Sequence, residues 1–237
     1  MTKADVREMV WRTLEVQGVA RFPGTRGRIP NFVGAERAAL GLQSLPAWRK
    51  ARVVKINPDA PQLPVRRMAL KEGKVVYMAV PRLRTLECFI ELDPARLGKQ
   101  IAQAASIKGA DRLGRRVPLE EVPKVDLIVC GSVAVNGEGA RVGKGGGFSD
   151  LEYGLLSEAG RVGPGTALVT TVHSLQLIPQ AIEMCPHDIP VDWVVTPDGP
   201  NRLTPVYPRP KGVYWEALTE EKIAEVPLLA RLRAGRG

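Results

Sequence analysis

Short apolar segments that alternate with longer helical patterns constrain the fold of this chain most strongly. The segment 126–130, Asp-Leu-Ile-Val-Cys, is apolar after its first residue, as expected of a strand covered on both faces. Similar candidate strands lie at 52–56, 75–80, 87–92, 167–172 and 193–196. Helical patterns lie at 31–45, 64–72, 97–106 and 148–157, and Val6, Met9, Val10 and Leu14 share one face of an N-terminal helix. The alternation predicts an α/β fold with a single three-layer α/β/α domain around a mixed, mostly parallel sheet.

The chain is long enough for one sizeable domain. Its 237 residues can bury a full core, and no long linker divides residues 1–229. We therefore expect one domain at 1–229 and a basic, flexible tail at 230–237. The longest nearly apolar stretch, 127–135, is too short to span a bilayer, and the charged N-terminal segment does not resemble a signal peptide. Because Cys88 and Cys130 lie in apolar segments, we expect buried reduced thiols in a cytoplasmic protein without a membrane partner.

Positive charge is concentrated in the first half of the chain. The net charge is +9, and residues 1–120 hold 23 basic and 11 acidic residues, whereas residues 121–237 hold 11 and 14. This asymmetry favours an anionic partner for the first half, such as a nucleotide, a polyanionic small molecule or RNA, unless it is simply a solvated basic surface. Basic and aromatic residues are not interleaved in the stacking pattern of many RNA-binding proteins.

A segment rich in glycine follows the apolar strand at 126–130. Its glycines are Gly131, Gly137, Gly139, Gly143, Gly145, Gly146 and Gly147. Glycine lets a ligand approach the peptide N–H groups, and a strand, glycine loop and helix N-terminus together favour an anion. Arg141 and Lys144 add positive charge for phosphate oxygens. The spacing matches neither a Walker A loop nor the dinucleotide-binding motif. The residues therefore favour a phosphate site of another kind over a mobile surface loop.

Asp150 follows this loop and has two interpretations. Ser149 and Glu152 have the spacing of a capping box, in which Asp150 only offsets the helix dipole. Alternatively, the Asp150 carboxylate is a ligand for Mg²⁺ beside phosphates. The residues alone favour the capping box.

Three further residues are candidate substrate contacts. Arg82 and Arg84 follow the strand at 75–80, and His173 follows the strand at 167–172, so all three lie at the sheet edge where open α/β sheets bind ligands. The arginines could hold the carboxylates of an anionic small molecule or a nucleic-acid phosphate, or remain solvated. His173 and His187 match no metal-binding spacing, and structural roles are favoured for both.

The glycine-rich segment resembles the signature of the 5-formyltetrahydrofolate cyclo-ligase family. Residues 139–150 follow the pattern G-x-R-[LI]-G-x-G-x-G-[YF]-[YF]-D without a gap, apart from Val142 and Ser149. The likeness is closest to the methenyltetrahydrofolate-synthetase-domain-containing subgroup and covers nearly the whole chain. Segments that carry it include Arg28-Ile-Pro-Asn-Phe32, Val80-Pro-Arg-Leu-Arg84, Asp150-Leu-Glu-Tyr153 and His187-Asp188-Ile189. The cyclo-ligase, NagB-like topology is the fold that this resemblance implies.

The resemblance implies an ATP- and Mg²⁺-dependent ring closure. ATP would phosphorylate the formyl oxygen of 5-formyltetrahydrofolate, and attack by the N10 amine would give 5,10-methenyltetrahydrofolate, ADP and phosphate. By position, it implies phosphate contacts from Lys3, Arg7, Arg141, Gly143, Lys144, Gly145, Gly146 and Gly147. It also implies catalytic roles for Arg141 and Lys144, and it makes Asp150 the Mg²⁺ ligand, in place of the capping interpretation.

Several positions depart from the family pattern. The departures are at Gly131, Asn136, Ser149 and Leu151, and only Asp59 is available as a counterpart of the family's folate-binding acid. The nucleotide half of the site is therefore better matched than the pterin half. A nucleotide-binding relative that has lost or changed its folate activity, and that is possibly associated with RNA, is the alternative.

Overall fold

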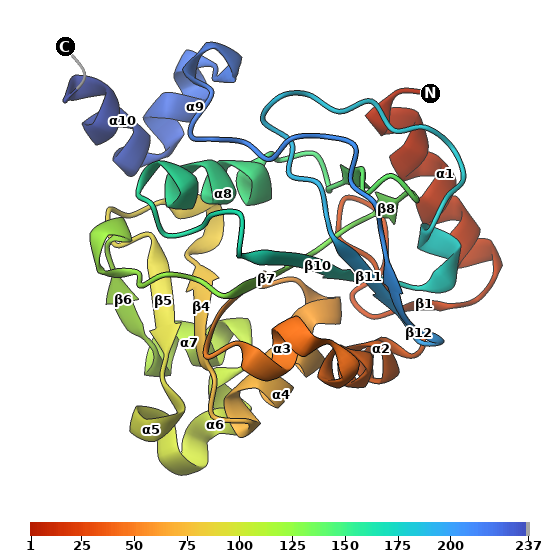
Figure 1. Cartoon of the computed structure of the whole chain (residues 1–237), viewed down its shortest axis with the longest axis horizontal. Helices are drawn as coiled ribbons and strands as arrows, with labels where there is room; N and C mark the ends of the chain where they lie inside the picture. The colour runs from red at the N-terminus through yellow and green to blue at the C-terminus, as the bar shows by residue number, and fades with distance from the viewer. Residues whose placement is uncertain (236–237) are drawn as a thin grey trace.

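A mixed eight-stranded sheet forms the centre of the computed structural model, which describes residues 1–235 (Figure 1). The strand order is β12-β11-β10-β7-β3-β4-β5-β6. The bounds are β3 Val53–Ile56, β4 Val75–Ala79, β5 Phe89–Leu92, β6 Arg115–Val117, β7 Leu127–Cys130, β10 Ala167–Thr171, β11 Trp193–Thr196 and β12 Gly199–Arg202. The five central strands run parallel, whereas β12, β5 and β6 pair antiparallel with their neighbours. The predicted α/β class with a mostly parallel sheet is confirmed.

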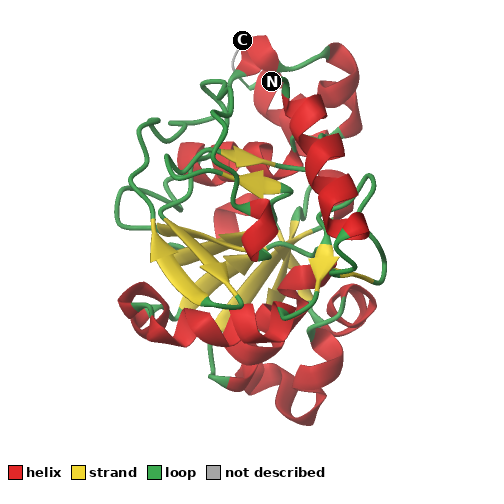
Figure 2. Ribbon diagram, turned by 90° about the vertical axis from the view of Figure 1, so that its right-hand side faces the viewer, coloured by secondary structure: helices red, strands yellow, loops and turns green. Residues whose placement is uncertain are grey.

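Helices cover both faces of this sheet. The bounds are α1 Lys3–Val16, α2 Ala35–Gly41, α3 Pro46–Lys50, α4 Leu63–Lys71, α5 Pro94–Leu97, α6 Ile101–Ala104, α7 Ile107–Leu113, α8 Phe148–Glu158, α9 Glu220–Glu225 and α10 Pro227–Ala234. In Figures 1 and 2, α8, α9 and α10 lie on one side of the sheet, and α2 to α7 lie on the other. The two main apolar cores follow these layers, because every residue of β7 is buried and its side chains alternate between them.

The N-terminal helix α1 packs beside the glycine-rich segment rather than on the main sheet. Val6, Val10 and Leu14 are buried against Val133 and Val142, which lie in or beside a small hairpin. Its strands are β8, Ala134–Val135, and β9, Arg141–Val142. The amphipathic pattern of the sequence therefore brings the N-terminus to the loop.

The helix predicted at 31–45 begins later than expected. Asn31–Phe32 forms strand β2 and pairs with β1, Ala20–Arg21. Gly34 then takes a left-handed conformation with φ of +88°, and α2 starts only at Ala35. A short strand and a glycine turn thus replace the first helical turn that the apolar spacing suggested.

The C-terminal region also differs from the expectation. The predicted tail at 230–237 begins inside α10, where Leu228 and Leu229 are buried against the α8 side of the sheet. Residues 230–234 therefore continue a helix where the sequence led us to expect a frayed segment, and residues 236–237 lie outside the described residues. The basic residues of this segment favoured a solvated tail in the sequence, although Leu228 and Leu229 anchor the helix in the core.

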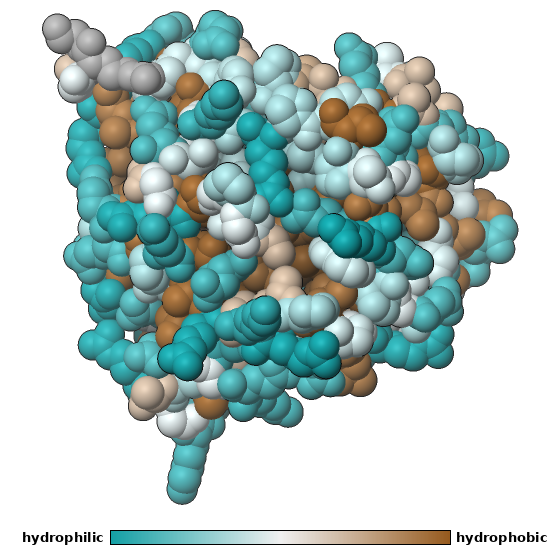
Figure 3. Space-filling view, viewed as in Figure 1, coloured by the Kyte–Doolittle hydropathy of each residue, from teal (hydrophilic) through white to brown (hydrophobic). Residues whose placement is uncertain are grey.

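Hydrophilic side chains cover most of the face seen in Figure 3, and apolar side chains are exposed there only in small groups. Among residues 1–235, no helix has the length and apolar character needed to cross a membrane. Cys88 and Cys130 are buried free thiols, as the sequence predicts, and Cys185 is an exposed one. The cytoplasmic location stays a prediction.

Candidate functional site

The glycine loop 143–147 leads from the β8–β9 hairpin directly into α8. Gly147 is the N-cap of α8, with φ of +68° and no side-chain cap. The capping box expected between Ser149 and Glu152 is wrong. The helix begins at Phe148, before Ser149, and the buried Glu152 carboxylate pairs with Lys55. The peptide N–H groups at this helix start therefore have no side-chain cap, which is the arrangement that favours an anion.

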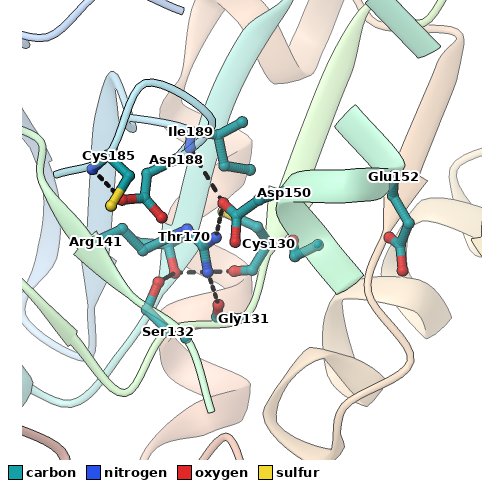
Figure 4. A network of polar contacts seen from close by, with 12 residues as sticks. Cys130, Gly131, Ser132, Arg141, Asp150, Glu152, Thr170, Cys185, Asp188 and Ile189 are labelled. Carbon is teal, nitrogen blue, oxygen red and sulfur yellow. Dashed lines mark hydrogen bonds and ion pairs between the residues drawn. The ribbon is translucent and has the colours of Figure 1, made fainter. Parts of the chain in front are cut away.

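Arg141 and Asp150 form a buried ion pair beneath this loop (Figure 4). Arg141 Nη2 donates to Asp150 Oδ1 at 2.6 Å and Nη1 donates to the carbonyl oxygen of Gly131 at 3.0 Å. The backbone N–H of Ile189 donates to the same Asp150 oxygen at 3.1 Å. Burial by itself would lower the pKa of Arg141, but Asp150 and then Cys130 outweigh it and raise that pKa above its ordinary value. Nε of Arg141 is buried and has no hydrogen-bond partner among the described residues.

Helix α1 contributes two more cations, Arg7 at the loop and Lys3 at Asp188. Arg7 Nε donates to the carbonyl oxygen of Gly143 at 2.7 Å, and its guanidinium carbon lies 3.5 Å from where a Cβ on Gly145 would stand. Partial burial lowers the pKa of Arg7, and Asp188 opposes that shift. Lys3 forms an ion pair with the Asp188 carboxylate. Of the two N-terminal cations that the resemblance implies, Arg7 thus contacts the loop directly and Lys3 contacts Asp188, which precedes the residue that donates to Asp150.

Lys144 connects the loop to the carboxyl end of β3. Its Nζ lies 2.8 Å from Asp59 Oδ1, and the Lys144 side chain is 46% exposed. The buried Arg66 donates to the carbonyl oxygens of Asn57 and Asp59, at 2.6 and 3.1 Å, and so fixes the turn that carries Asp59. Burial lowers the pKa of Arg66 to about 10, and Asp59 opposes that shift. Arg66 thus holds the backbone of Asp59 in place, and Asp59 Oδ2 lies 3.0 Å from where a Cβ on Gly131 would stand.

A second buried ion pair lies on the far side of α8 and was missed in the sequence. Lys55 of β3 pairs with Glu152 of α8, and their side chains are 2% and 8% exposed. Figure 4 shows Glu152 on the opposite side of α8 from Asp150. Burial raises the pKa of Glu152, and Lys55 opposes that shift. Lys55 Nζ also donates to Asn57 Oδ1 at 2.5 Å, and Asn57 Nδ2 donates to Ser149 Oγ at 3.3 Å. The available signal was a lysine in the middle of an otherwise apolar strand.

The three predicted substrate residues lie outside this cluster. Arg82 contacts Glu225 of α9 at 3.5 Å. The hydrogen bond from Lys222 is the main cause of the lowered pKa of Glu225, and Arg82 and Arg84 lower it further. His173 Nδ1 accepts a hydrogen bond from the backbone N–H of Leu175 at 3.2 Å, and its ring centroid lies 6.0 Å from that of Phe32. The structure therefore gives His173 the local structural contacts that the sequence favoured.

The remaining predicted residues come together around one loop. They are Lys3, Arg7, Arg141, Gly143, Lys144, Gly145, Gly146, Gly147 and Asp150. Within residues 1–235 there is no group of three or more histidine, cysteine or acidic residues that could hold a metal. Asp150 offers a single carboxylate, which is the kind of protein ligand that Mg²⁺ uses when nucleotide phosphates and water fill its other positions.

Comparison with known proteins identifies the family of this chain. The model of the 5-formyltetrahydrofolate cyclo-ligase family matches residues 2–197. Methenyltetrahydrofolate synthase domain-containing proteins of Bos taurus and Homo sapiens are 39% and 35% identical to this chain over 237 residues. The matches cover 98% and 99% of this chain but 62% of each relative. This chain thus spans less than two thirds of the length of these relatives.

A solved structure supports the fold. The 5,10-methenyltetrahydrofolate synthetase of Aquifex aeolicus superposes with a TM-score of 0.55 at 24% identity, covering 92% of this chain and all of that one. At that identity the likeness establishes the fold alone. The family match spans most of the chain and includes the glycine loop, α8 and the ends of β3, β7, β10 and β11. The chain therefore belongs to the 5-formyltetrahydrofolate cyclo-ligase family.

Proposed function

We propose that this protein closes 5-formyltetrahydrofolate to 5,10-methenyltetrahydrofolate, using ATP and Mg²⁺ and releasing ADP and phosphate. The observation that carries the proposal is the Arg141–Asp150 pair under an uncapped helix start, with Arg7 and Lys144 beside the same loop. Phosphoryl transfer depends mainly on positioning and on neutralising charge, and needs no nucleophile from the protein. This cluster offers cations, backbone N–H groups and one carboxylate, which suits that reaction.

The residues present fit a magnesium nucleotide. ATP supplies the phosphoryl group that activates the formyl oxygen when it is bound. Arg7 and Lys144 would neutralise phosphate oxygens, and the N–H groups at the start of α8 would donate to them. The buried Arg141 would hold the Asp150 carboxylate in the position where it ligates Mg²⁺, and its partnerless Nε is a further donor in the site.

The substrate side of the proposal rests on the end of β3. Asp59 presents a carboxylate next to Lys144, and the buried Asn57 carboxamide positions Ser149 beside it. A carboxylate and a hydroxyl are groups that hydrogen-bond to a pterin ring. Arg82 and Arg84 follow β4 at the same edge of the sheet and would attract an anionic glutamate tail. A reduced folate is therefore the proposed second substrate.

A turnover assay tests this function. Purified protein is mixed with 5-formyltetrahydrofolate, ATP and Mg²⁺, and formation of the methenyl product is followed by its absorbance. We expect no product when ATP or 5-formyltetrahydrofolate is left out, and less than a tenth of the rate when Mg²⁺ is chelated. Nucleotide binding without product would support the alternative, a relative with lost or changed folate activity. Salt-dependent RNA binding that maps to residues 1–120 would then assign the basic half to RNA.

A further inference from the structure

A cavity of about 190 Å³ lies against α8, on the side that carries Asp150. One wall is formed by the end of the glycine loop and by α8, with Gly147, Asp150 and Gly154 in contact with the space. The other wall is formed by residues 212–222, which lie beyond the part of the chain that the family model matches. This second wall is therefore a feature of the chain that the family match does not explain.

The second wall is held firmly against α8. A Cβ on Gly154 would lie 2.8 Å from the carbonyl oxygen of Gly212, so only glycine permits this approach. The backbone N–H of Val213 donates to Glu158 Oε2 at 3.1 Å, and Ser157 Oγ donates to the carbonyl oxygen of Pro210 at 3.3 Å. The wall is thus an ordered part of the site.

The lining of the cavity is aromatic and apolar, which suits a flat aromatic ring. The rings of His187 and Tyr214 meet there with centroids 6.4 Å apart and planes inclined at 58°, and both belong to the lining. Leu151 and Leu218 supply apolar surface. Lys222 also lines the cavity, and its Nζ lies 3.8 Å from the centroid of the Phe148 ring. Apolar surface with a few polar groups is typical of a site for a planar heterocycle.

The cavity is continuous with the phosphate side of the loop. It shares Gly147 and Asp150 with the proposed phosphate site, and His187 directly precedes Asp188, the partner of Lys3. The polar groups at the end of β3, Asn57 and Asp59, are not among its lining residues. A ligand with phosphates at the loop and a ring in this cavity would therefore be a nucleotide, with the end of β3 left for the second substrate.

We propose that residues 212–222 hold the purine ring of the nucleoside triphosphate, with Tyr214 as the main contact. This assignment rests on the proposed function in that it takes the phosphates to lie at the glycine loop. It predicts that the base adds affinity beyond that of the phosphates alone. Tyr214 is a binding residue in this assignment and takes no part in the chemistry.

Binding of two ligands to the same protein tests the assignment. Isothermal titration in Mg²⁺ buffer gives the Kd of a non-hydrolysable ATP analogue and of inorganic tripolyphosphate, which has no base. Tyr214→Ala should weaken binding of the analogue about tenfold, or about 1.4 kcal/mol, because the stacking of an aromatic side chain on the base is lost. Binding of tripolyphosphate should not change. Tyr214→Phe should retain the wild-type ratio, and so should Glu216→Gln, an exposed position in the same wall that does not line the cavity.

Each other outcome overturns the assignment. Equal weakening of both ligands would mean that the substitution disturbs the loop, and unchanged binding of both would mean that no base enters the cavity. A rise only in the KM for 5-formyltetrahydrofolate would give the cavity to the second substrate. Ring closure measured on the same wild-type preparation tests the proposed function separately. If the protein shows no turnover but Tyr214→Ala weakens only the ATP analogue, the proposed reaction is wrong and the assignment of the purine site remains.

Discussion

Arg141 and Asp150 are joined across 2.6 Å, and their ion pair ties strand β9 to the first turn of α8. The guanidinium is 2% exposed and the carboxylate is 14% exposed. Because β9 precedes the glycine loop and α8 follows it, this single contact fixes both ends of the loop. The same carboxylate that holds the loop is the proposed ligand for Mg²⁺.

Replacement of Asp150 should separate these two roles. Asp150→Asn keeps a carbonyl oxygen for Arg141 and Ile189 but removes the charge that binds Mg²⁺. We expect ring closure to fall by at least 10²-fold, measured as methenyl absorbance over a range of Mg²⁺ concentrations. Glu138→Gln, in the exposed turn of the β8–β9 hairpin, should retain the wild-type rate. Wild-type turnover by Asp150→Asn would remove Asp150 from the metal site.

Lys144 should matter for catalysis and little for stability. The Lys144 side chain is 46% exposed and that of Asp59 is 12% exposed, and ion pairs with one solvated partner contribute about 0–1 kcal/mol. Lys144→Ala should therefore leave the urea midpoint nearly unchanged while kcat falls about 10²-fold, as on loss of a donor to a charged transition state. Lys124→Ala, exposed before the amino end of β7 and so away from the loop, is the matched control. A kcat for Lys144→Ala equal to that of the control would exclude a catalytic role.

The buried pair of Lys55 and Glu152 should behave in the opposite way. Glu152→Ala leaves the Lys55 ammonium without its carboxylate in a nearly closed space, which should cost about 3–5 kcal/mol in the free energy of unfolding. Replacing both residues, as Lys55→Met with Glu152→Leu, should recover most of that loss because no charge remains buried. Urea unfolding of the single and double variants measures both effects. Equal destabilisation of the two would show that the unpaired Lys55 charge is not the cause of the loss.

His173 should make stability depend on pH. Burial lowers the pKa of His173 in the folded state, and Asp198 opposes the shift only in part. As the pH falls below about 6.5, the unfolded chain binds a proton more readily than the folded protein, so stability is lost on acidification and is fully present above that pH. Protonation would also end the hydrogen bond that Nδ1 accepts from Leu175, which is worth about 1 kcal/mol.

The comparison for His173 is a variant that does not titrate. His173→Asn can still accept from the backbone at this cap, so its stability at pH 8 should stay close to that of the wild type. Between pH 7 and 5, thermal unfolding of the wild type should lose more stability than that of His173→Asn. Parallel pH profiles for the two proteins would contradict the shift.

The parts of the fold that the sequence predicted are those with strong local patterns. The segment 127–130 is apolar throughout, which is typical of a buried strand. The apolar residues of α1 recur at helical spacing, which is typical of a helix packed on one face. Strand β12, Gly199–Arg202, was missed because its residues are polar and its place at the sheet edge depends on pairing with β11. Local propensity contains no information on that pairing.

The site was predictable to a similar degree. Consecutive residues define the glycine loop, so the motif indicated both the loop and Asp150. The Lys55–Glu152 pair and the wall at 212–222 depend on residues that are distant in the sequence and meet only in the folded chain. Ser149 illustrates the same limit. Its spacing to Glu152 is that of a capping box, but the helix starts two residues earlier than a Ser149 cap requires, and Glu152 pairs with Lys55.

The stoichiometry of a single reaction tests the central claim most directly. Wild-type protein is given limiting 5-formyltetrahydrofolate with excess ATP and Mg²⁺, and ADP and the methenyl product are measured in the same sample. We predict one ADP for each methenyl group formed, with ADP release ending when the folate is consumed. ADP released at the same rate without folate, or no methenyl product at all, would contradict the account.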